Sequence, residues 1–474
     1  RWAGLWADPV KERVDIFCLL EYQGNYLVLG TRIPIETPVL SSHTPYFPGA
    51  DRLERHAQDM AGVAFVDHPD ERRWTRHRAW GEGEFPLRED FPVQGHRRGL
   101  TPPDDDYPFR AIEGTGVDEI PVGPVHAGII EPGHFRFQAV GETVLRLEER
   151  LGYVHKGIEK IASGRDPIAL ARLAGRVSGD STVAHAWAAC QAMERAAGLD
   201  VPERALFLRA IMAERERIAN HLGDIGAICN DVGFAFAWHQ CARLREWWQR
   251  ENARHFGHRF MMDAIVPGGV AFDLAGEGIE RLRDAHLALR QDIGPLFDIL
   301  EDHPGLEDRL LGTGRLDPEA ARALGCTGYV GRASGMDFDV RRHSPYGPYD
   351  RLKIPGSCLD AGDVAARMQI RMEEVIISLD ILDQLLDQLP GGPCRTAFPA
   401  PPEGAEGLGI IDGWRGEIAS YVRFGTDGHI ARFFPRDPSW FTWPALERLM
   451  HGNIVPDFPV CNKSINGSYS GHDL

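Results

Sequence analysis

The sequence predicts an α+β fold: a small N-terminal α+β domain, then a mainly helical domain that carries small β-sheets. Short β-rich segments lie near both ends of the chain, and long stripes of apolar residues at helical spacing fill the middle. A stretch rich in Pro, Gly and Asp separates the two parts. At 474 residues the chain exceeds one ordinary core, so two or three domains are expected.

The N-terminal domain is predicted to span residues 1–92. Two β-rich segments, 14–20 and 26–30, flank a turn at 23–25, which predicts a β-hairpin. Residues 50–61 fit a short helix. We therefore expect a compact unit of one hairpin and one helix.

Residues 93–122 are predicted to form a linker, because Pro, Gly and Asp recur there without helical or strand periodicity. The second domain is predicted to span residues 123–474. Its apolar stripes predict long helices and its alternating segments predict a strand pair; the helices are expected at 142–162, 166–198, 202–231, 239–256, 276–302 and 361–389, and the strands at 417–424 and 429–434.

Composition narrows the classes of function. The formal net charge of −17 argues against nucleic acid as a partner, because phosphates require basic patches. No apolar run approaches the ~18 residues that span a bilayer. The chain starts without Met or a signal-peptide pattern, as expected of a chain trimmed upstream. The eight cysteines show no C-x-x-C spacing, so we expect buried, reduced thiols and no iron–sulfur cluster within this chain.

Several segments of the N-terminal domain resemble the 30-kDa subunit family of respiratory complex I in order and spacing: Thr44–Asp51, Glu54–Val63, His68–Arg73 and Phe85–Pro92. The resemblance implies a structural, redox-inert domain.

The second domain resembles the 49-kDa subunit of complex I and, more closely, the large subunit of group 4 nickel–iron hydrogenases, including the hydrogenase-4 and formate-hydrogenlyase types. The segments that carry this resemblance are Gly123–His126, Glu131–Phe135, Tyr153–Lys160, Glu214–Leu222 and Arg332–Tyr349. It implies the mainly helical fold of that family. Fusion of the two subunits is typical of the hydrogenlyase branch.

The metal-ligand cysteines of that family are missing. A nickel–iron site needs four soft thiolates, two from an early and two from a late C-x-x-C motif. The resemblance places the early ligands at Ser178 and Ser181, and the late ligands at Ser468 and Gly471. Neutral hydroxyls are poor substitutes for thiolates. The sequence therefore predicts that this chain holds no nickel and is not an active hydrogenase.

In the complex I branch the same space forms the pocket for the quinone headgroup. The resemblance places the quinone-bonding His at His134 and the Asp that orients it at Asp231. Such a pair suits proton uptake, since a carboxylate raises imidazole basicity and fixes its tautomer. The family's quinone-bonding Tyr aligns with Gly179, and a nearby hydroxyl of Ser178, Ser181 or Tyr469 would have to replace it. Residue type alone favours a simple turn histidine at position 134.

Glu159 matches a proton-transferring acid of the hydrogenases; the alternative is a structural ion pair, and both hypotheses stay open. Arg332, Arg341 and Arg342 match a region that faces an iron–sulfur cluster on a partner subunit, where positive charge favours the reduced cluster. The alternative is a salt-bridge network with Asp337 and Asp339. Two more histidines in predicted helices, His185 and His221, are expected to be satisfied within the core or an interface.

The resemblance implies a peripheral subunit on the cytoplasmic side of the cell membrane, in a complex of the NADH:quinone oxidoreductase type. The expected partners are a small subunit bearing a 4Fe–4S cluster and antiporter-like membrane subunits. NADH would bind elsewhere, because no G-x-G-x-x-G follows a strand in this chain. The alternative function is a catalytically silent scaffold for an ion-translocating complex.

Overall fold

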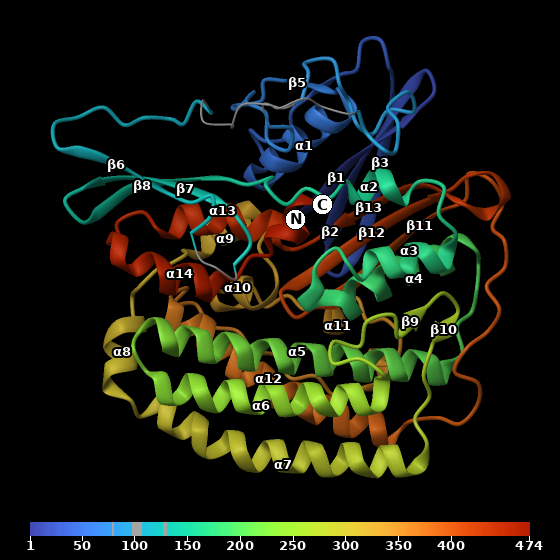
Figure 1. The fold of residues 1–474 in the computed structure, drawn as a ribbon, viewed down its shortest axis with the longest axis vertical. Coiled ribbons are helices and arrows are strands. Elements are labelled where there is room, and N and C mark those ends of the chain that lie inside the picture. Colours follow the sequence, from blue (N-terminus) through green and yellow to red (C-terminus); the bar gives the residue numbers. More distant parts are fainter. Residues whose placement is uncertain (78–79, 97–106, 127–129) are drawn as a thin grey trace.

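The computed structural model of the chain describes residues 1–77, 80–96, 107–126 and 130–474. The N-terminal part packs on top of the strands and helices of the second part, and a bundle of long helices forms the opposite end (Figure 1). Within these described ranges, no helix combines the length and the hydropathy needed to cross a membrane.

The N-terminal domain is one antiparallel sheet in the order β1-β2-β3, covered by helix α1. The predicted hairpin is confirmed, and so is the helix. A strand that the sequence analysis missed, β1, precedes them. The elements are β1 (Trp2–Val10), β2 (Arg13–Tyr22), β3 (Asn25–Pro34), β4 (Val39–Ser41), α1 (Asp51–Ala61) and β5 (Ala64–Val66). Positive φ at Gln23 and Gly24 makes the tight turn between β2 and β3.

The second domain begins with a three-stranded sheet in the order β6-β7-β8. Its strands are β6 (Val117–Val122), β7 (His134–Val140) and β8 (Thr143–Arg150). Two expectations fail here. Strand β6 occupies the end of the predicted linker, and β8 replaces the first part of the helix predicted at 142–162, of which α2 (Ile158–Ala162) alone is helical. Pairing with β7 across the turn at Gly141 overrides the local helical pattern.

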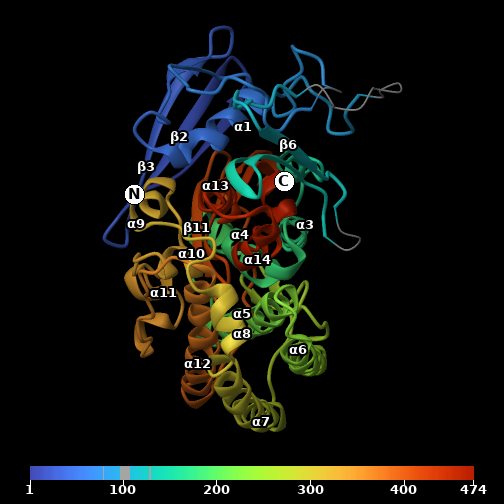
Figure 2. The same cartoon turned by 90° about the vertical axis from the view of Figure 1, so that its left-hand side faces the viewer.

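The long helices predicted from apolar periodicity are confirmed, except that a break at Gly175–Ser181 divides the one predicted at 166–198. The helices are α3 (Pro167–Ala174), α4 (Thr182–Ala196), α5 (Glu203–Asp231), α6 (Ala235–Phe256), α7 (Gly276–Glu301), α8 (Pro304–Leu310), α9 (Pro318–Leu324), α10 (Gly328–Ala333), α11 (Val340–His343), α12 (Val364–Asp387), α13 (Ser439–Leu449), α14 (Phe458–Ile465) and α15 (Tyr469–Asp473). Helices α5, α6, α7 and α12 lie side by side as the bundle (Figures 1 and 2).

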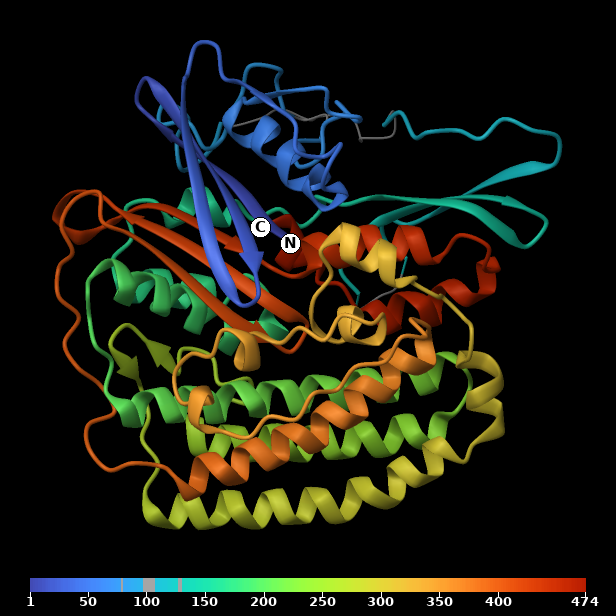
Figure 3. The same ribbon diagram turned by 180° about the vertical axis from the view of Figure 1, so that it is seen from behind.

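A further three-stranded sheet of the second domain, β11-β12-β13, packs on α4 and, in the view from behind, crosses in front of α3 and α4 (Figure 3). Its strands are β11 (Glu406–Gly413), β12 (Gly416–Phe424) and β13 (Ile430–Arg436), and a two-residue pair, β9 (Ile265–Val266) and β10 (Gly269–Val270), lies apart. Close packing of β11 on α4 requires glycine, since a Cβ on Gly409 would lie 1.9 Å from the carbonyl oxygen of Ala188.

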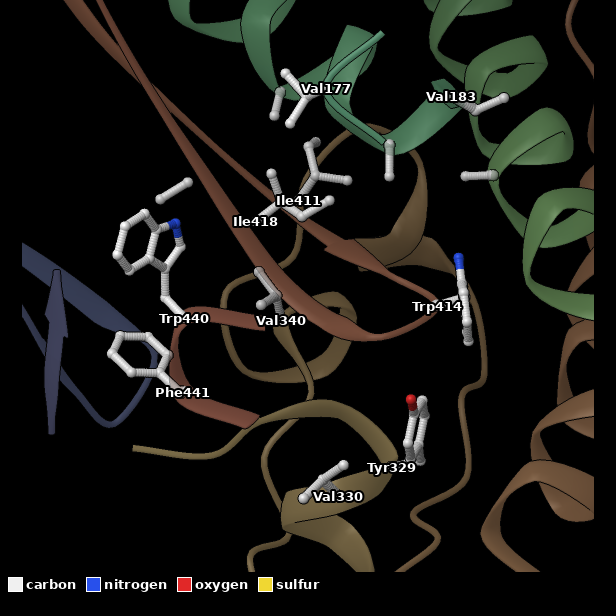
Figure 4. Close-up of a cluster of buried hydrophobic side chains, with 14 of the residues drawn as sticks. Val177, Val183, Tyr329, Val330, Val340, Ile411, Trp414, Ile418, Trp440 and Phe441 are labelled. Atoms are coloured by element: carbon white, nitrogen blue, oxygen red, sulfur yellow. The ribbon is translucent and has the colours of Figure 1, made fainter. Parts of the chain in front are cut away.

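One hydrophobic core joins the two domains. Trp6 of β1 packs against aromatic rings of the central sheet, 5.0 Å from Tyr421 and 5.7 Å from Phe434 between centroids. On the other side of that sheet, Val177 lies near Ile411 and Ile418 (Figure 4), and Val183 of α4 belongs to the same buried cluster. The buried face of the sheet thereby fixes the loop between α3 and α4, where the candidate site lies.

Candidate functional site

The four positions that match the missing metal ligands lie together, although Ser178 and Ser468 are 290 residues apart. Their hydroxyl oxygens are 2.8 Å apart. The backbone N–H of Gly471 donates to Ser468 Oγ at 2.9 Å, and Ser181 lies in the short 3₁₀ turn (Gly179–Ser181) that leads into α4. The break between α3 and α4 and the start of α15 therefore build one small polar site.

An ion pair closes this site. The guanidinium of Arg415, at the turn between β11 and β12, binds both carboxylate oxygens of Asp180 at 2.7 and 2.6 Å. Ser178 Oγ donates to the same carboxylate at 2.7 Å, and Arg415 reaches Ser181 Oγ at 3.3 Å. Burial raises the pKa of Asp180, but the charge of Arg415 outweighs it and lowers that pKa overall. A protein cation thus stands among the residues that the resemblance places at the metal-ligand positions.

Arg415 is held in place from two sides. Its Nε donates to the carbonyl oxygen of Asn466 at 2.6 Å, and its guanidinium carbon lies 4.0 Å from the centroid of the Trp414 ring. Trp414 in turn stacks on Tyr329 (Figure 4), with ring centroids 6.2 Å apart. The arginine is therefore fixed by packing as well as by its ion pair.

The residues present do not fit a nickel–iron centre. Serine hydroxyls lack the soft, anionic sulfur that such metals require. A Cβ on Gly471 would lie 2.8 Å from Cγ of Asp437, a carboxylate fixed by a 2.8 Å bond to His185 Nε2. Among the described residues, no group of three or more His, Cys, Asp and Glu side chains could hold a metal ion.

His134 opens β7, but the structure does not pair it with Asp231. Its Nδ1 lies 3.4 Å from the carbonyl oxygen of Gly123, and its Nε2 accepts from Arg136 at 3.1 Å. Burial and the Arg136 charge lower the pKa of His134, which favours the neutral ring. Asp231 ends α5, and burial raises its pKa while its Oδ2 has no hydrogen-bond partner. The predicted pair of His134 and Asp231 is therefore not formed.

A second histidine, His126, contacts Tyr469, one of the three residues whose hydroxyl could replace the tyrosine missing at Gly179. His126 Nε2 lies 3.3 Å from Tyr469 Oη. Ser178 and Ser181, the other candidates, are engaged with Asp180 and Arg415. The imidazole–phenol pair joins Gly123–His126 to α15, two segments that the sequence analysis named without linking them.

Glu159 takes part in a structural ion pair with His56 and Arg432. One oxygen is 2.6 Å from His56 Nε2 of α1, and the other accepts a hydrogen bond from Arg432 of β13. Burial raises the pKa of Glu159, but Arg432 and His56 outweigh it and hold the pKa at about 2. The carboxylate stays ionised at neutral pH and ties the N-terminal domain to the second one.

Glu216, which sequence analysis did not single out, has the opposite environment. Its oxygens accept from the backbone N–H groups of Val183 and Ala184, at 2.7 and 3.2 Å, at the start of α4. Burial raises the pKa of Glu216 to about 8, with repulsion from Asp180 adding to it and the two amide bonds opposing it. Nothing in the local sequence distinguishes this acid from its neighbour Glu214. The packing of Glu216 behind the site distinguishes it from Glu214.

The arginines of the predicted cluster fall into two groups. Arg332 and Arg341 are buried in a salt-bridge network in which Arg332 binds Glu374, and Arg341 binds Glu214 and Asp339, at 3.0 and 2.7 Å.

Arg342 instead is partly exposed and binds both oxygens of Asp337, at 2.7 and 3.0 Å. The two helical histidines are buried as predicted and each is satisfied at one nitrogen: Nε2 of His185 binds Asp437 and Nε2 of His221 binds Glu374, each at 2.8 Å, whereas Nδ1 of each ring has no hydrogen-bond partner among the described residues. Of the three arginines, Arg342 is therefore the one whose charge can face a partner subunit.

Comparisons with known proteins agree with this architecture. Residues 4–97 match the family described as the respiratory-chain NADH dehydrogenase 30 Kd subunit, and residues 231–402 match its 49 Kd subunit. Residues 156–223 match the nickel-dependent hydrogenase family. The last match contains Ser178 and Ser181.

Individual relatives cover nearly the whole chain. Formate hydrogenlyase subunit 5 of Escherichia coli is 33% identical over 94% of this chain and 79% of its own length. The C/D protein of NADH-quinone oxidoreductase from Bacteroides fragilis is 30% identical over 92% of this chain and 87% of its own length. A protein of the archaeal membrane-bound sulfane sulfur reductase superposes with a TM-score of 0.71 at 27% identity, covering 76% of this chain and 99% of that one.

Both domains, their order and their fusion are thus shared with formate hydrogenlyase subunit 5 and the C/D protein, whereas the archaeal protein matches only part of the chain. The chain belongs to the family of fused respiratory-chain 30-kDa and 49-kDa subunits, which includes formate hydrogenlyase subunit 5 and the C/D proteins of NADH-quinone oxidoreductase.

Proposed function

We propose that this chain is a peripheral-arm subunit of a membrane-bound respiratory oxidoreductase, with a quinone-module-like cavity and no nickel–iron centre. The observation that carries the proposal is the Arg415–Asp180 ion pair at 2.6 Å among the former ligand positions. A fixed guanidinium supplies positive charge where relatives of the hydrogenase type place metal. In this proposal the redox step uses an acceptor that takes up hydrogen bonds and protons.

His126 and Tyr469 are the proposed contacts for a quinone-like headgroup. A phenol hydroxyl and an imidazole 3.3 Å apart can each bond a carbonyl oxygen, and quinone reduction consumes two protons. Tyr469 takes the role of the hydroxyl that is lost at Gly179. His134 and Asp231 remain in the proposal as separate proton-handling groups, since one is a neutral imidazole and the other a carboxyl whose pKa burial raises.

Glu216 is the proposed proton-holding acid behind the site, in place of Glu159. A carboxyl with a pKa of about 8 changes its protonation near neutral pH, whereas one with a pKa of about 2 does not. Glu159 is assigned to the joint between the domains.

The proposed partners follow from the family. A small subunit with a 4Fe–4S cluster would deliver electrons, and Arg342 offers a surface charge to that face. Antiporter-like membrane subunits would anchor the chain to the cytoplasmic side of the membrane.

The second candidate function is a scaffold without electron transfer. The same ion pair favours it, because Ser178, Ser181, Asp180 and Arg415 satisfy one another and leave fewer polar groups for a ligand.

Quinone-analogue binding to the assembled complex separates these functions. Tyr469→Phe and His126→Gln are expected to weaken binding about tenfold or more, the loss of one or two hydrogen bonds. The surface variant Tyr46→Phe is the matched control and should bind normally. His134→Ala and Asp231→Asn test the two remaining groups. Unchanged binding in all four variants would leave the scaffold function, and stoichiometric nickel in the same preparation would contradict both.

A further inference from the structure

Two carboxylates of the second domain share one guanidinium of the first. Nη2 of Arg52, on α1, lies 3.0 Å from Oε2 of Glu149 on β8 and 3.0 Å from Oε1 of Glu447 on α13. The same Glu447 oxygen accepts the backbone N–H of Glu149 at 2.7 Å. If both acids are ionised, the group carries two negative charges and one positive charge.

The surroundings make that surplus charge costly. Glu149 is 1% exposed, and its Oε1 has no hydrogen-bond partner. Arg52 is similarly enclosed, and its Nη1 also lacks one. A buried carboxylate without full hydrogen bonding is strongly disfavoured relative to its neutral acid.

Neighbouring charges do not remove the surplus. Asp51 of α1 and Glu148 of β8 are negative, and each has its own partner: Arg55 lies 3.6 Å from Asp51, and Arg72 lies 2.6 Å from Glu148. The larger adjoining hollow is also lined by Asp317, Glu319, Arg448 and His451, the smaller one by Asp70 and Arg110, and both by Arg146. Arg52 is the cation that bonds the pair.

Protons can reach the pair from solvent. A hollow of about 990 Å³ and a smaller one of about 270 Å³ are both lined by Arg52 and Glu447. Glu149 lines the smaller one. The Glu447 side chain is 28% exposed, so it provides the route by which a proton enters or leaves.

We propose that Glu149 and Glu447 form a proton-binding site at the junction of the two domains, where the pair holds one proton and Arg52 neutralises the remaining charge. The site is separate from the polar site around Ser178, Ser468 and Arg415 and does not rest on the proposed function. Protonation keeps α1 docked on β8 and α13 without surplus buried charge, so the junction is sensitive to pH.

The direction of that sensitivity follows from linkage. Burial and mutual repulsion raise the pKa of both Glu149 and Glu447 in the folded protein. The folded state therefore binds a proton that the unfolded state has already released above the ordinary glutamate pKa. The stability contributed by this proton is present at low pH and is lost as pH rises through the raised folded pKa.

Infrared spectroscopy of the full chain tests the proposal. The wild type should show a protonated-carboxyl band near neutral pH whose amplitude falls in Glu149→Gln and Glu447→Gln by about one group per chain. Glu148→Gln, on the same strand but paired with Arg72, is the control and should leave the band unchanged.

Unfolding in urea provides the second measurement. Between pH 6 and pH 9 the wild type should lose more stability than either Gln variant, because the amide cannot become charged. If Glu149→Gln does not fold, Glu447→Gln provides the same comparison, because position 447 is partly exposed and tolerates the change better. A band of equal amplitude in wild type and Gln variants, or equal pH slopes, would overturn the proposal.

Discussion

Helix α1 carries two contacts between the domains that differ in charge balance. His56 and Arg52 lie one turn apart, and each reaches a buried glutamate of the second domain. Glu159 receives two basic partners, His56 and Arg432, whereas Arg52 is shared between Glu149 and a second acid.

The two glutamates are buried to almost the same degree, at 3% and 1% exposure, yet their pKa values move in opposite directions. The pKa of Glu159 falls to about 2, and that of Glu149 rises well above its ordinary value. Burial disfavours the charge in both cases, so the number of cations per carboxylate decides the outcome. Equal burial of an acid therefore says little about its protonation.

The largest expected effect comes from breaking the Glu159 contact, in which two basic side chains surround one carboxylate. Glu159→Gln should lower the free energy of unfolding by about 3–5 kcal/mol, because it leaves a buried Arg432 without its counter-charge. Urea unfolding at pH 7 measures the loss, with the exposed Glu142→Gln as control. In the wild type this contribution should be present above pH 4.5 and lost as pH falls toward 2, since the folded pKa is depressed. A loss no larger than that of the control would contradict the assignment.

Removing the shared cation should cost somewhat less. Arg52→Met is expected to destabilise the protein by roughly 2–3 kcal/mol at pH 8, because the two acids can respond by taking up a proton. The penalty should shrink as pH is lowered toward 5, opposite to the behaviour of the Glu159 contact. Urea unfolding across this range follows it, and a penalty independent of pH would argue that the acids do not share a proton.

The Asp180–Arg415 ion pair has one acid and one base, so its charges balance. Asp180→Asn should lower stability by about 1–2 kcal/mol, a value discounted because the Asp180 side chain is 34% exposed. The loss should vary little between pH 6 and pH 9. Asp166→Ala tests an ordinary helix cap on α3 for comparison, and an Asp180→Asn effect below that of the cap would show the ion pair to be dispensable.

The smallest expected effect sharpens the role of His56. Its Nδ1 lies 2.7 Å from Thr75 Oγ1, which fixes the ring that binds Glu159. Thr75→Val removes this bond at nearly constant volume and should cost about 0.5–1 kcal/mol in urea unfolding. Thr75→Ser keeps the hydroxyl and should lose less; if it loses as much, the methyl group and not the bond is responsible.

Much of the fold follows from local pattern. The hairpin around Gln23 and the long helices α5, α6, α7 and α12 were predictable because their apolar periodicity agrees with their final packing. Strand β8 was not, since pairing with β7 decided its conformation against a helical spacing of leucines.

The candidate site was likewise predictable only in part. The ordered motifs located Ser178 and Ser468, and hydroxyls in place of thiolates determined which metals the site cannot suit. Sequence could not show that Arg415 closes that site or that Tyr469 meets His126.

By itself, the sequence determined the family and the domain order, and it predicted the loss of metal-binding sulfur, because these depend on residue identity and order along the chain. The tertiary structure alone decided which acids carry a proton and which carry a charge. That depends on the cations, amide donors and water within a few ångströms of each carboxyl, and residues distant in sequence, such as Arg432 beside Glu159 and Arg52 beside Glu149, supply them.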